Sequence, residues 1–232
     1  MLLQILTYTH HLTTMLFGIF LSAFFLGVKQ NKKNVCILLG GAAVSGLFFL
    51  ICNTVFGSLF TEAIYPLFVH LPLFLLLVFY YRFRWLPSII SIMTAYLCCQ
   101  FSNWAGIFAL SLSGLDWVYY LVRIIVTVAV FAFLSRYLCQ TTALLLAKSD
   151  RELYILGAMP FVYYVFDYST TKFSMLLYSG NKVVVEFLAF AMCISYVIFL
   201  FVYFQEYELK NRAEQYGQLT NMQLNSLHSE IE

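Results

Sequence analysis

The sequence predicts an all-α fold: a polytopic membrane bundle of about seven transmembrane helices, followed by a cytoplasmic helix of coiled-coil type. Three observations support this prediction. Of the 232 residues, 62% are hydrophobic and 10% are charged, whereas soluble domains are about 45–50% apolar and about 25% charged. Apolar runs of about 20 residues, long enough to cross a bilayer as helices, recur along the chain. After residue 204 the sequence becomes polar and favours helix formation, without proline, as far as Glu232.

The expected spans are separated by polar or turn-forming segments. They cover about residues 5–28, 35–56, 63–81, 87–110, 117–135, 152–166 and 183–204. Pro87 suits the first turn of the fourth span, and Pro160 interrupts the sixth, which is the shortest. The connection 137–150 is amphipathic and should lie on the inner interface, while 167–182 is the longest outer segment. The sequence therefore predicts no folded extracellular domain.

The distribution of basic residues predicts the orientation of the bundle. Ten lysine and arginine residues fall in the connections after the first, third, fifth and seventh spans, and two fall in the opposite connections. The ten are Lys29, Lys32, Lys33, Arg82, Arg84, Arg136, Lys148, Arg151, Lys210 and Arg212, and the two are Lys172 and Lys182. Because connections rich in lysine and arginine stay in the cytoplasm, we expect the N-terminus outside and the C-terminal helix inside. The N-terminus lacks the basic segment of a signal peptide, so the first apolar run should remain as a span.

Polar residues within the spans gather in the outer half of the predicted bundle. They indicate either interhelical hydrogen bonds or a water-filled vestibule that opens outward and accepts a ligand. The residues expected to bind a ligand there are His70, Asn103, Arg123, Asp167 and Glu186. Arg123 cannot lose its charge and therefore needs an anion, and Glu186, at a similar depth, is its expected partner.

The sequence contains no pattern typical of a catalytic or metal site. The six cysteines form no C-x-x-C motif and lie in or beside apolar spans, which favours a packing role. Histidines and carboxylates are not spaced as metal ligands, and neither a glycine-rich nucleotide loop nor a nucleophile with its base occurs. A net charge of +2 gives no support for a nucleic-acid partner. We therefore expect no catalytic residue, metal or cofactor in this chain.

The polar C-terminal segment carries a narrow apolar stripe. Its members recur every three or four residues: Ala213, Tyr216, Thr220, Leu224, Leu227 and Ile231. This spacing is typical of a two-stranded coiled coil, so we expect a homodimer, and a solvated tail helix is the alternative. His228 lacks the context of a phospho-accepting histidine and is expected to be exposed. The chain thus divides into a transmembrane domain, residues 1–204, and a linker and dimerisation helix, residues 205–232.

A family resemblance rests on the end of the last span. Residues 201–215 read Phe-Val-Tyr-Phe-Gln-Glu-Tyr-Glu-Leu-Lys-Asn-Arg-Ala-Glu-Gln and follow several aromatic-rich spans. This layout resembles the input half of bacterial sensor histidine kinases of the accessory-gene-regulator type, whose kinase end carries a GHKL-type ATP-binding domain. The resemblance implies a multi-pass receptor in the bacterial plasma membrane, a peptide pheromone as extracellular ligand, and a dimeric linker helix that passes the signal to the kinase.

The kinase part of that family has no counterpart in residues 1–232. The phospho-acceptor motif and the ATP-binding boxes are not found, so ATP, Mg²⁺ and a response regulator are expected only through a kinase domain outside this sequence. We expect either a truncated sequence or a degenerate receptor. The competing hypothesis is a membrane transport component, such as a substrate-binding subunit. The polar outer half suits both functions, and the coiled-coil stripe favours the receptor.

Overall fold

The structure, a computed structural model, describes residues 2–57, 61, 64–172 and 182–231. For residues 65, 151, 168–172, 182–189 and 224–231 the description is limited to the backbone. Every secondary-structure element within these ranges is a helix, which confirms the predicted all-α class. The chain divides into two compact units, Met1–Cys193 and Ile194–Glu232.

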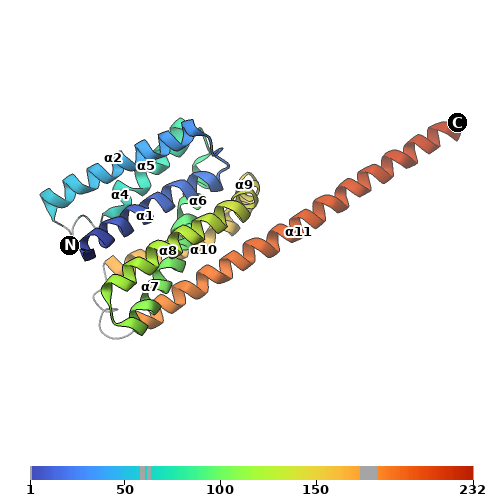
Figure 1. Ribbon diagram of the computed structural model, residues 1–232. Helices are drawn as coiled ribbons and strands as arrows, with labels where there is room; N and C mark the ends of the chain where they lie inside the picture. The colour runs from blue at the N-terminus through green and yellow to red at the C-terminus, as the bar shows by residue number, and fades with distance from the viewer. Residues whose placement is uncertain (1, 58–60, 62–63, 173–181, 232) are drawn as a thin grey trace. The chain divides into compact units, whose positions relative to one another are not determined.

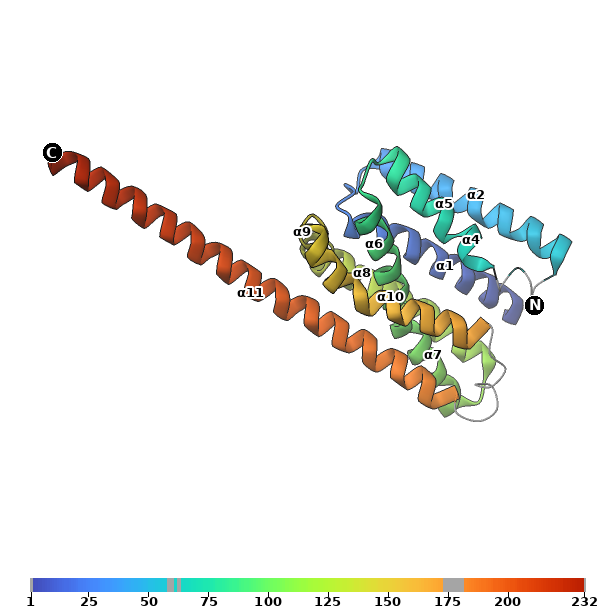
Figure 2. The ribbon, with the colours of Figure 1, turned by 180° about the vertical axis from the view of Figure 1, so that it is seen from behind.

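The first unit is a bundle in which successive helical segments alternate in direction (Figures 1 and 2). Its helices are α1 (Leu2–Phe25), α2 (Lys32–Phe56), α4 (Tyr65–Phe68), α5 (His70–Leu75), the π-helix η1 (Leu76–Tyr80), α6 (Trp85–Cys98), α7 (Gln100–Ser113), α8 (Asp116–Tyr137), α9 (Cys139–Leu146), α10 (Asp150–Lys172) and the start of α11 (Lys182–Ile231). Helices α6 and α7 follow each other through Cys99, which keeps a helical backbone conformation.

Local signals explain several helix ends. The side chain of Asn31 accepts a hydrogen bond from the backbone N–H of Asn34 and so caps the start of α2. Helix α7 ends at Gly114, whose φ of 66° lies in the left-handed region that glycine adopts without strain. Asp116 in the first turn and Arg136 in the last turn of α8 match the sign of the helix dipole.

Proline affects the third and sixth expected spans differently. The third is divided into α4, a turn at Val69, α5 and η1. Pro72 has no N–H to donate to the carbonyl of Phe68, so the helix cannot continue regularly across this turn. Helix α10, in contrast, continues through Pro160 and runs past residue 166 to Lys172. The helix therefore extends six residues beyond the end of the sixth expected span, and Asp167 in this extension accepts a hydrogen bond from Tyr96 of α6.

Helix α1 lies at the centre of the bundle and packs against α2, α6, α8 and α9. Its second half is buried, with Leu21 and Phe25 fully so. The Ser91 hydroxyl of α6 donates to the backbone carbonyl of Ser22 at 2.5 Å. A small residue allows close packing elsewhere, because a Cβ at Gly157 of α10 would lie 2.6 Å from Cγ1 of Ile90 in α6.

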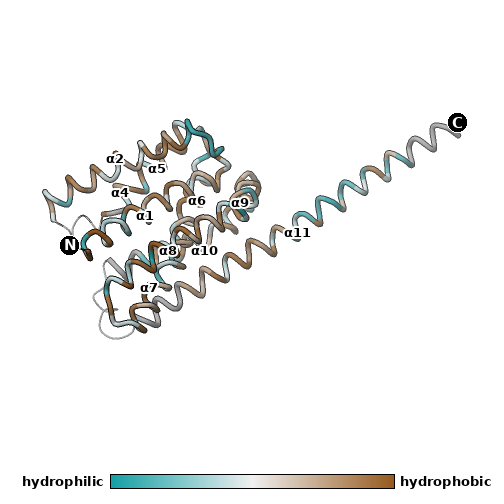
Figure 3. Tube along the Cα trace, viewed as in Figure 1, coloured by the Kyte–Doolittle hydropathy of each residue, from teal (hydrophilic) through white to brown (hydrophobic). Residues whose placement is uncertain are grey.

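Four helices of the described chain are long and apolar enough to cross a membrane. They are Lys32–Phe56, Trp85–Ser113, Asp116–Tyr137 and Phe190–Gln223, and a shorter apolar stretch covers Pro66–Tyr80. Large apolar side chains on their surfaces are exposed, as expected for helices that face lipid. Figure 3 shows that hydrophobic residues predominate along these helices of the first unit. The first and sixth expected spans correspond to α1 and α10, which are not among these four helices.

The second unit consists of one helical stretch, the part of α11 from Ile194 onward. Helix α11 has 50 residues and no break, which corresponds to about 75 Å at 1.5 Å per residue. Hydrophobic residues fill its first part and polar residues its second part (Figure 3). The expected helix over residues 205–232 is thus confirmed as far as Ile231, while its pairing with a second copy stays a prediction.

Candidate functional site

A hydrogen-bonded cluster, which we call the His70 network, joins α5, α6 and α10 in the interior of the bundle. Nδ1 of His70 lies 2.8 Å from the hydroxyl of Tyr164, and the hydroxyl of Tyr96 donates to Oδ2 of Asp167 at 2.5 Å. The Tyr96 ring centroid lies 5.0 Å from that of Tyr164 and 5.7 Å from that of His70. Two of the residues expected from the sequence, His70 and Asp167, therefore belong to one network.

The two tyrosines of this network were not predicted. Tyr164 lies three residues before Asp167 on α10, a spacing that puts both side chains on one helix face. Tyr96 comes from α6 and contacts both of the other helices. The Tyr–x–x–Asp spacing was a usable signal for Tyr164, whereas local sequence contains no signal for the partners of Tyr96.

A second cluster surrounds Arg123 of α8. The Nη1 of Arg123 donates to the hydroxyl of Tyr119, and the guanidinium carbon lies 5.1 Å from the centroid of that ring. The aliphatic part of Arg123 packs on Gly106 of α7, where an added Cβ would lie 2.8 Å from Cδ of the arginine and closer still to its Cγ. Only glycine at position 106 leaves room for Arg123 in this conformation.

The charge of Arg123 acts on His10 of α1 and on Cys99 between α6 and α7. His10 is 3% exposed, and its ring centroid lies 5.9 Å from that of Tyr120. Within the described residues no carboxylate pairs with Arg123, and its buried Nε has no hydrogen-bond partner. The side chain of Glu186 lies outside the described residues, so its expected pairing with Arg123 stays a prediction.

Asn103, the remaining expected site residue, lies on α7. Its side-chain amide is 3.4 Å from Oε1 of Gln100, which is buried. Asn103 precedes Gly106 by three residues and so shares the face of α7 that packs against α8. This position relates Asn103 to the Arg123 cluster rather than to the His70 network.

Both clusters lie toward the same end of the first unit. Helices α1 and α8 begin at this end and α10 ends there (Figure 1). His10, Arg123 and Asp167 each lie within the two or three helical turns next to these helix ends. The connections from α1 to α2, from η1 to α6 and from α8 through α9 to α10 lie at the opposite end. Both clusters therefore place polar side chains in the interior at the same end of the bundle.

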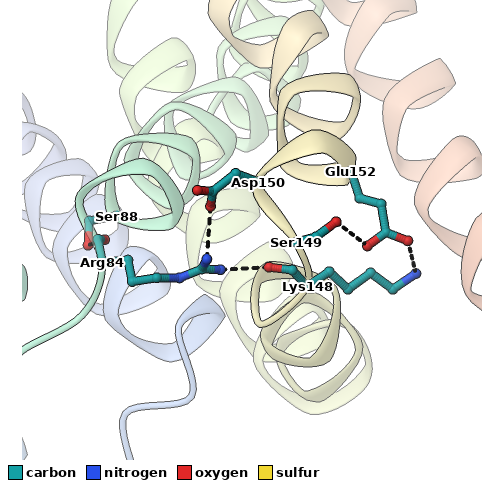
Figure 4. A network of polar contacts seen from close by, with 6 residues as sticks. All are labelled: Arg84, Ser88, Lys148, Ser149, Asp150 and Glu152. Carbon is teal, nitrogen blue, oxygen red and sulfur yellow. Dashed lines mark hydrogen bonds and ion pairs between the residues drawn. The ribbon is translucent and has the colours of Figure 1, made fainter.

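The opposite end is held together by ionic contacts between α6 and the start of α10 (Figure 4). Nη1 of Arg84 lies 2.8 Å from Oδ1 of Asp150, and Nη2 donates to the carbonyl oxygen of Lys148 at 2.6 Å. Exposed Glu152 accepts a hydrogen bond from Ser149 and lies 3.5 Å from the Lys148 ammonium.

All six cysteines are free thiols, and the described residues contain no group of three or more histidines, cysteines or carboxylates suited to a metal ion. Ala213 and Tyr216 of the expected coil are exposed on α11. The side chains of Leu224, Leu227 and Ile231 lie outside the described residues.

Comparison of the chain with protein-family models, curated proteins and solved structures found no match. The resemblance to sensor histidine kinases therefore stays a prediction from the sequence.

Proposed function

We propose that the chain is the membrane receptor region of a two-component sensor histidine kinase of the bacterial plasma membrane. The observation that supports this most is α11, a single helix of 50 residues that changes from apolar to polar along its length. A helix of about 75 Å is more than twice as long as the hydrocarbon core of a bilayer, about 30 Å. One continuous helix can therefore connect a transmembrane segment to a cytoplasmic output.

In this proposal seven segments cross the membrane, with the N-terminus outside. These segments are α1, α2, α4 to η1, α6 with α7, α8, α10 and the first part of α11. The alternating direction of the helices in the first unit supports this count. Basic residues support the orientation: Lys29, Lys32, Lys33, Arg82, Arg84, Arg136, Lys148 and Arg151 all belong to connections or helix termini at one end of the bundle.

The proposed ligand site is the polar region at the other end, which would face outward. An extracellular ligand, in this family a peptide, would contact the His70 network and the Arg123 cluster. These groups come from α1, α5, α6, α7, α8 and α10, so a ligand that binds them can shift several helices at once. Helix α11 would carry that shift to the cytoplasm.

Homodimerisation through α11 is the second part of the proposal. Tyr216 lies on the predicted stripe and is 70% exposed, and Leu209, four residues before the first member of the stripe, is 66% exposed. Apolar side chains on an otherwise polar helix favour pairing with a second copy. We expect a weak coil, because Gly217 and several amide side chains interrupt the apolar surface.

Disulfide crosslinking in native membranes tests both parts. Single cysteines at Leu224 or Leu227 in a cysteine-free chain should form covalent dimers, while a cysteine at Gln218, on the opposite face of the helix, should not. Culture medium of the source organism, applied from outside, should change the crosslinked fraction at Leu224. Equal crosslinking at Leu224 and Gln218 would contradict dimerisation through a coiled coil. If no component of the culture medium changes the extent of crosslinking at Leu224, the proposed receptor function is contradicted.

A transport component is the alternative, favoured by the polar groups inside the bundle. Uptake of labelled peptides into proteoliposomes that contain the purified chain separates the two functions. A receptor changes its crosslinking without accumulating peptide, whereas a transport protein accumulates it.

A further inference from the structure

Arg123 is a permanent positive charge at membrane depth with no described acidic partner. It lies seven residues after Asp116, the first residue of α8, which places it about 10 Å along the helix from that end. A guanidinium in hydrocarbon is costly unless an anion or water compensates it. Within the described residues the ion pairs involve other cations only. The guanidinium of Arg123 would therefore be stabilised by an anion.

The guanidinium is held in one orientation. Its stem fills the space above Gly106, and its Nη1 is engaged by the Tyr119 hydroxyl. The edge formed by Nε and Nη2 makes no hydrogen bond within the described residues, and Nε is buried. This edge carries two parallel N–H donors, which match the two oxygens of a carboxylate.

The surroundings also favour an anion. The charge of Arg123 acts on His10 and Cys99, and neither a neutral imidazole nor a thiol carries a negative charge. Tyr119 accepts a hydrogen bond from Arg123, so its own hydroxyl proton is free to point to a bound oxygen. The rings of Tyr119 and Tyr120, 5.0 Å apart, provide apolar surface beside the charge.

We propose that Arg123, with Tyr119 and His10 beside it, binds the carboxylate of an apolar organic acid or peptide. The Nε and Nη2 edge holds the two oxygens, and the aromatic rings contact the apolar part of the ligand. This site rests on the proposed function in one respect only, the side of the membrane from which the ligand enters. That side is the end of the bundle where α1 and α8 begin. The site is independent of dimerisation through α11.

The test measures the melting temperature of the purified chain in phosphatidylcholine nanodiscs with two probes. The probes are N-acetylphenylalanine, which carries a carboxylate, and N-acetylphenylalaninamide, which has the same shape without the charge. At saturating concentration the carboxylate should raise Tm by about 5 °C and the amide should not. Arg123→Gln should abolish the shift, and Arg123→Lys should weaken binding at least about tenfold because the two-donor edge is lost.

Two control variants separate a specific role of Arg123 from a general effect of charge or folding. Arg136→Gln, which removes an exposed cation on the same helix, should retain the full Tm shift caused by the carboxylate. Tyr119→Phe provides a second variant should Arg123→Gln fail to fold, and it should weaken carboxylate binding. No shift in the wild-type chain, or a shift that survives Arg123→Gln, would overturn the proposal.

Two further outcomes would also overturn it. A shift that appears in maltoside detergent but not in nanodiscs would mean that lipid phosphate occupies the site. A shift that appears only in Glu186→Gln would mean that Glu186 is the anion. A negative result here leaves the crosslinking of α11 unaffected, so failure of the carboxylate site and failure of the receptor function can be distinguished.

Discussion

The hydroxyl of Tyr96 in α6 donates a hydrogen bond to the carboxylate of Asp167 in α10, 71 residues away along the chain. The two helices run in the same direction and are joined at three levels. Arg84 pairs with Asp150 near their starts, Ile90 packs on Gly157 in the middle, and Tyr96 reaches Asp167 near the far end. Helices α6 and α10 therefore form a pair fixed along its length, and each contact can be tested separately.

Replacing Tyr96 by phenylalanine should destabilise the bundle by about 1 kcal/mol, because interhelical hydrogen bonds in membranes contribute about 0.6–1.7 kcal/mol. The free energy of unfolding in bicelles, measured by steric trapping, checks this value. Tyr80→Phe is the matched control, since Tyr80 is half-exposed in η1, and it should change stability by less than about 0.5 kcal/mol. Equal costs for the two variants would contradict a specific role of the Tyr96 hydroxyl.

Gly157→Ala should cost about 1–3 kcal/mol, because the new methyl group would lie 2.6–2.7 Å from Cγ1 and Cδ1 of Ile90. Gly40→Ala in α2 is the control: nothing lies within 4 Å of a Cβ there, so alanine should be neutral or stabilising. The same unfolding measurement applies.

A rescue variant sharpens this test. Ile90→Ala removes the atoms that the new methyl group would meet, so the double variant should be more stable than the sum of the single effects predicts. Strict additivity would show that the cost of Gly157→Ala has another origin.

The helical content of the chain could be predicted from apolar runs, since each expected span corresponds to helix in the described residues. The position of His70 and Asp167 in the same half of the bundle followed from depth alone. The contacts that connect them through Tyr96 and Tyr164 could not be predicted, because they depend on which helices face each other. Tyr96 and Asp167 are 71 residues apart in the sequence, and His70 and Tyr164 are 94 residues apart. Local periodicity contains no information about such pairs.

The expected role of Arg123 illustrates the same limit. Its need for an anion follows from its charge, but Gly106 and Tyr119 as the groups that orient it became apparent only from the packing of α7 on α8. A glycine in an apolar helix gives no sign in the sequence that it accommodates an arginine from another helix.

The contacts of Arg84 should contribute unequally. Its pair with Asp150 is at least half-exposed on both sides, so Asp150→Ala should cost less than about 1 kcal/mol. Arg84→Ala should cost more, because it also removes the hydrogen bond to the Lys148 carbonyl. Unfolding measured at low salt and in about 0.5 M NaCl should show that the Asp150 effect is screened and the additional Arg84 effect is not. An Asp150 effect larger than that of Arg84 would contradict this division.

Two buried thiols offer a test of how the start of α11 packs. Cys98 of α6 and Cys193 of α11 are 1% and 0% exposed and are hydrogen-bonded to each other within the first unit. With the other four cysteines replaced by serine, oxidation by copper phenanthroline in native membranes should link them in most molecules. A protease site inserted between residues 147 and 150 allows detection, because the cleaved halves should stay joined on non-reducing gels.

The control for this crosslink pairs Cys193 with Cys36, an exposed thiol on α2, which should leave the cleaved halves separate. Formation of the Cys98–Cys193 bond should also raise the unfolding temperature, because it closes a loop of 95 residues in the unfolded chain. Linkage of both pairs to the same extent would indicate nonspecific oxidation. Linkage of neither would mean that α11 does not pack against α6 in the membrane, and the transmission of a signal through α11 would then need a different neighbouring helix.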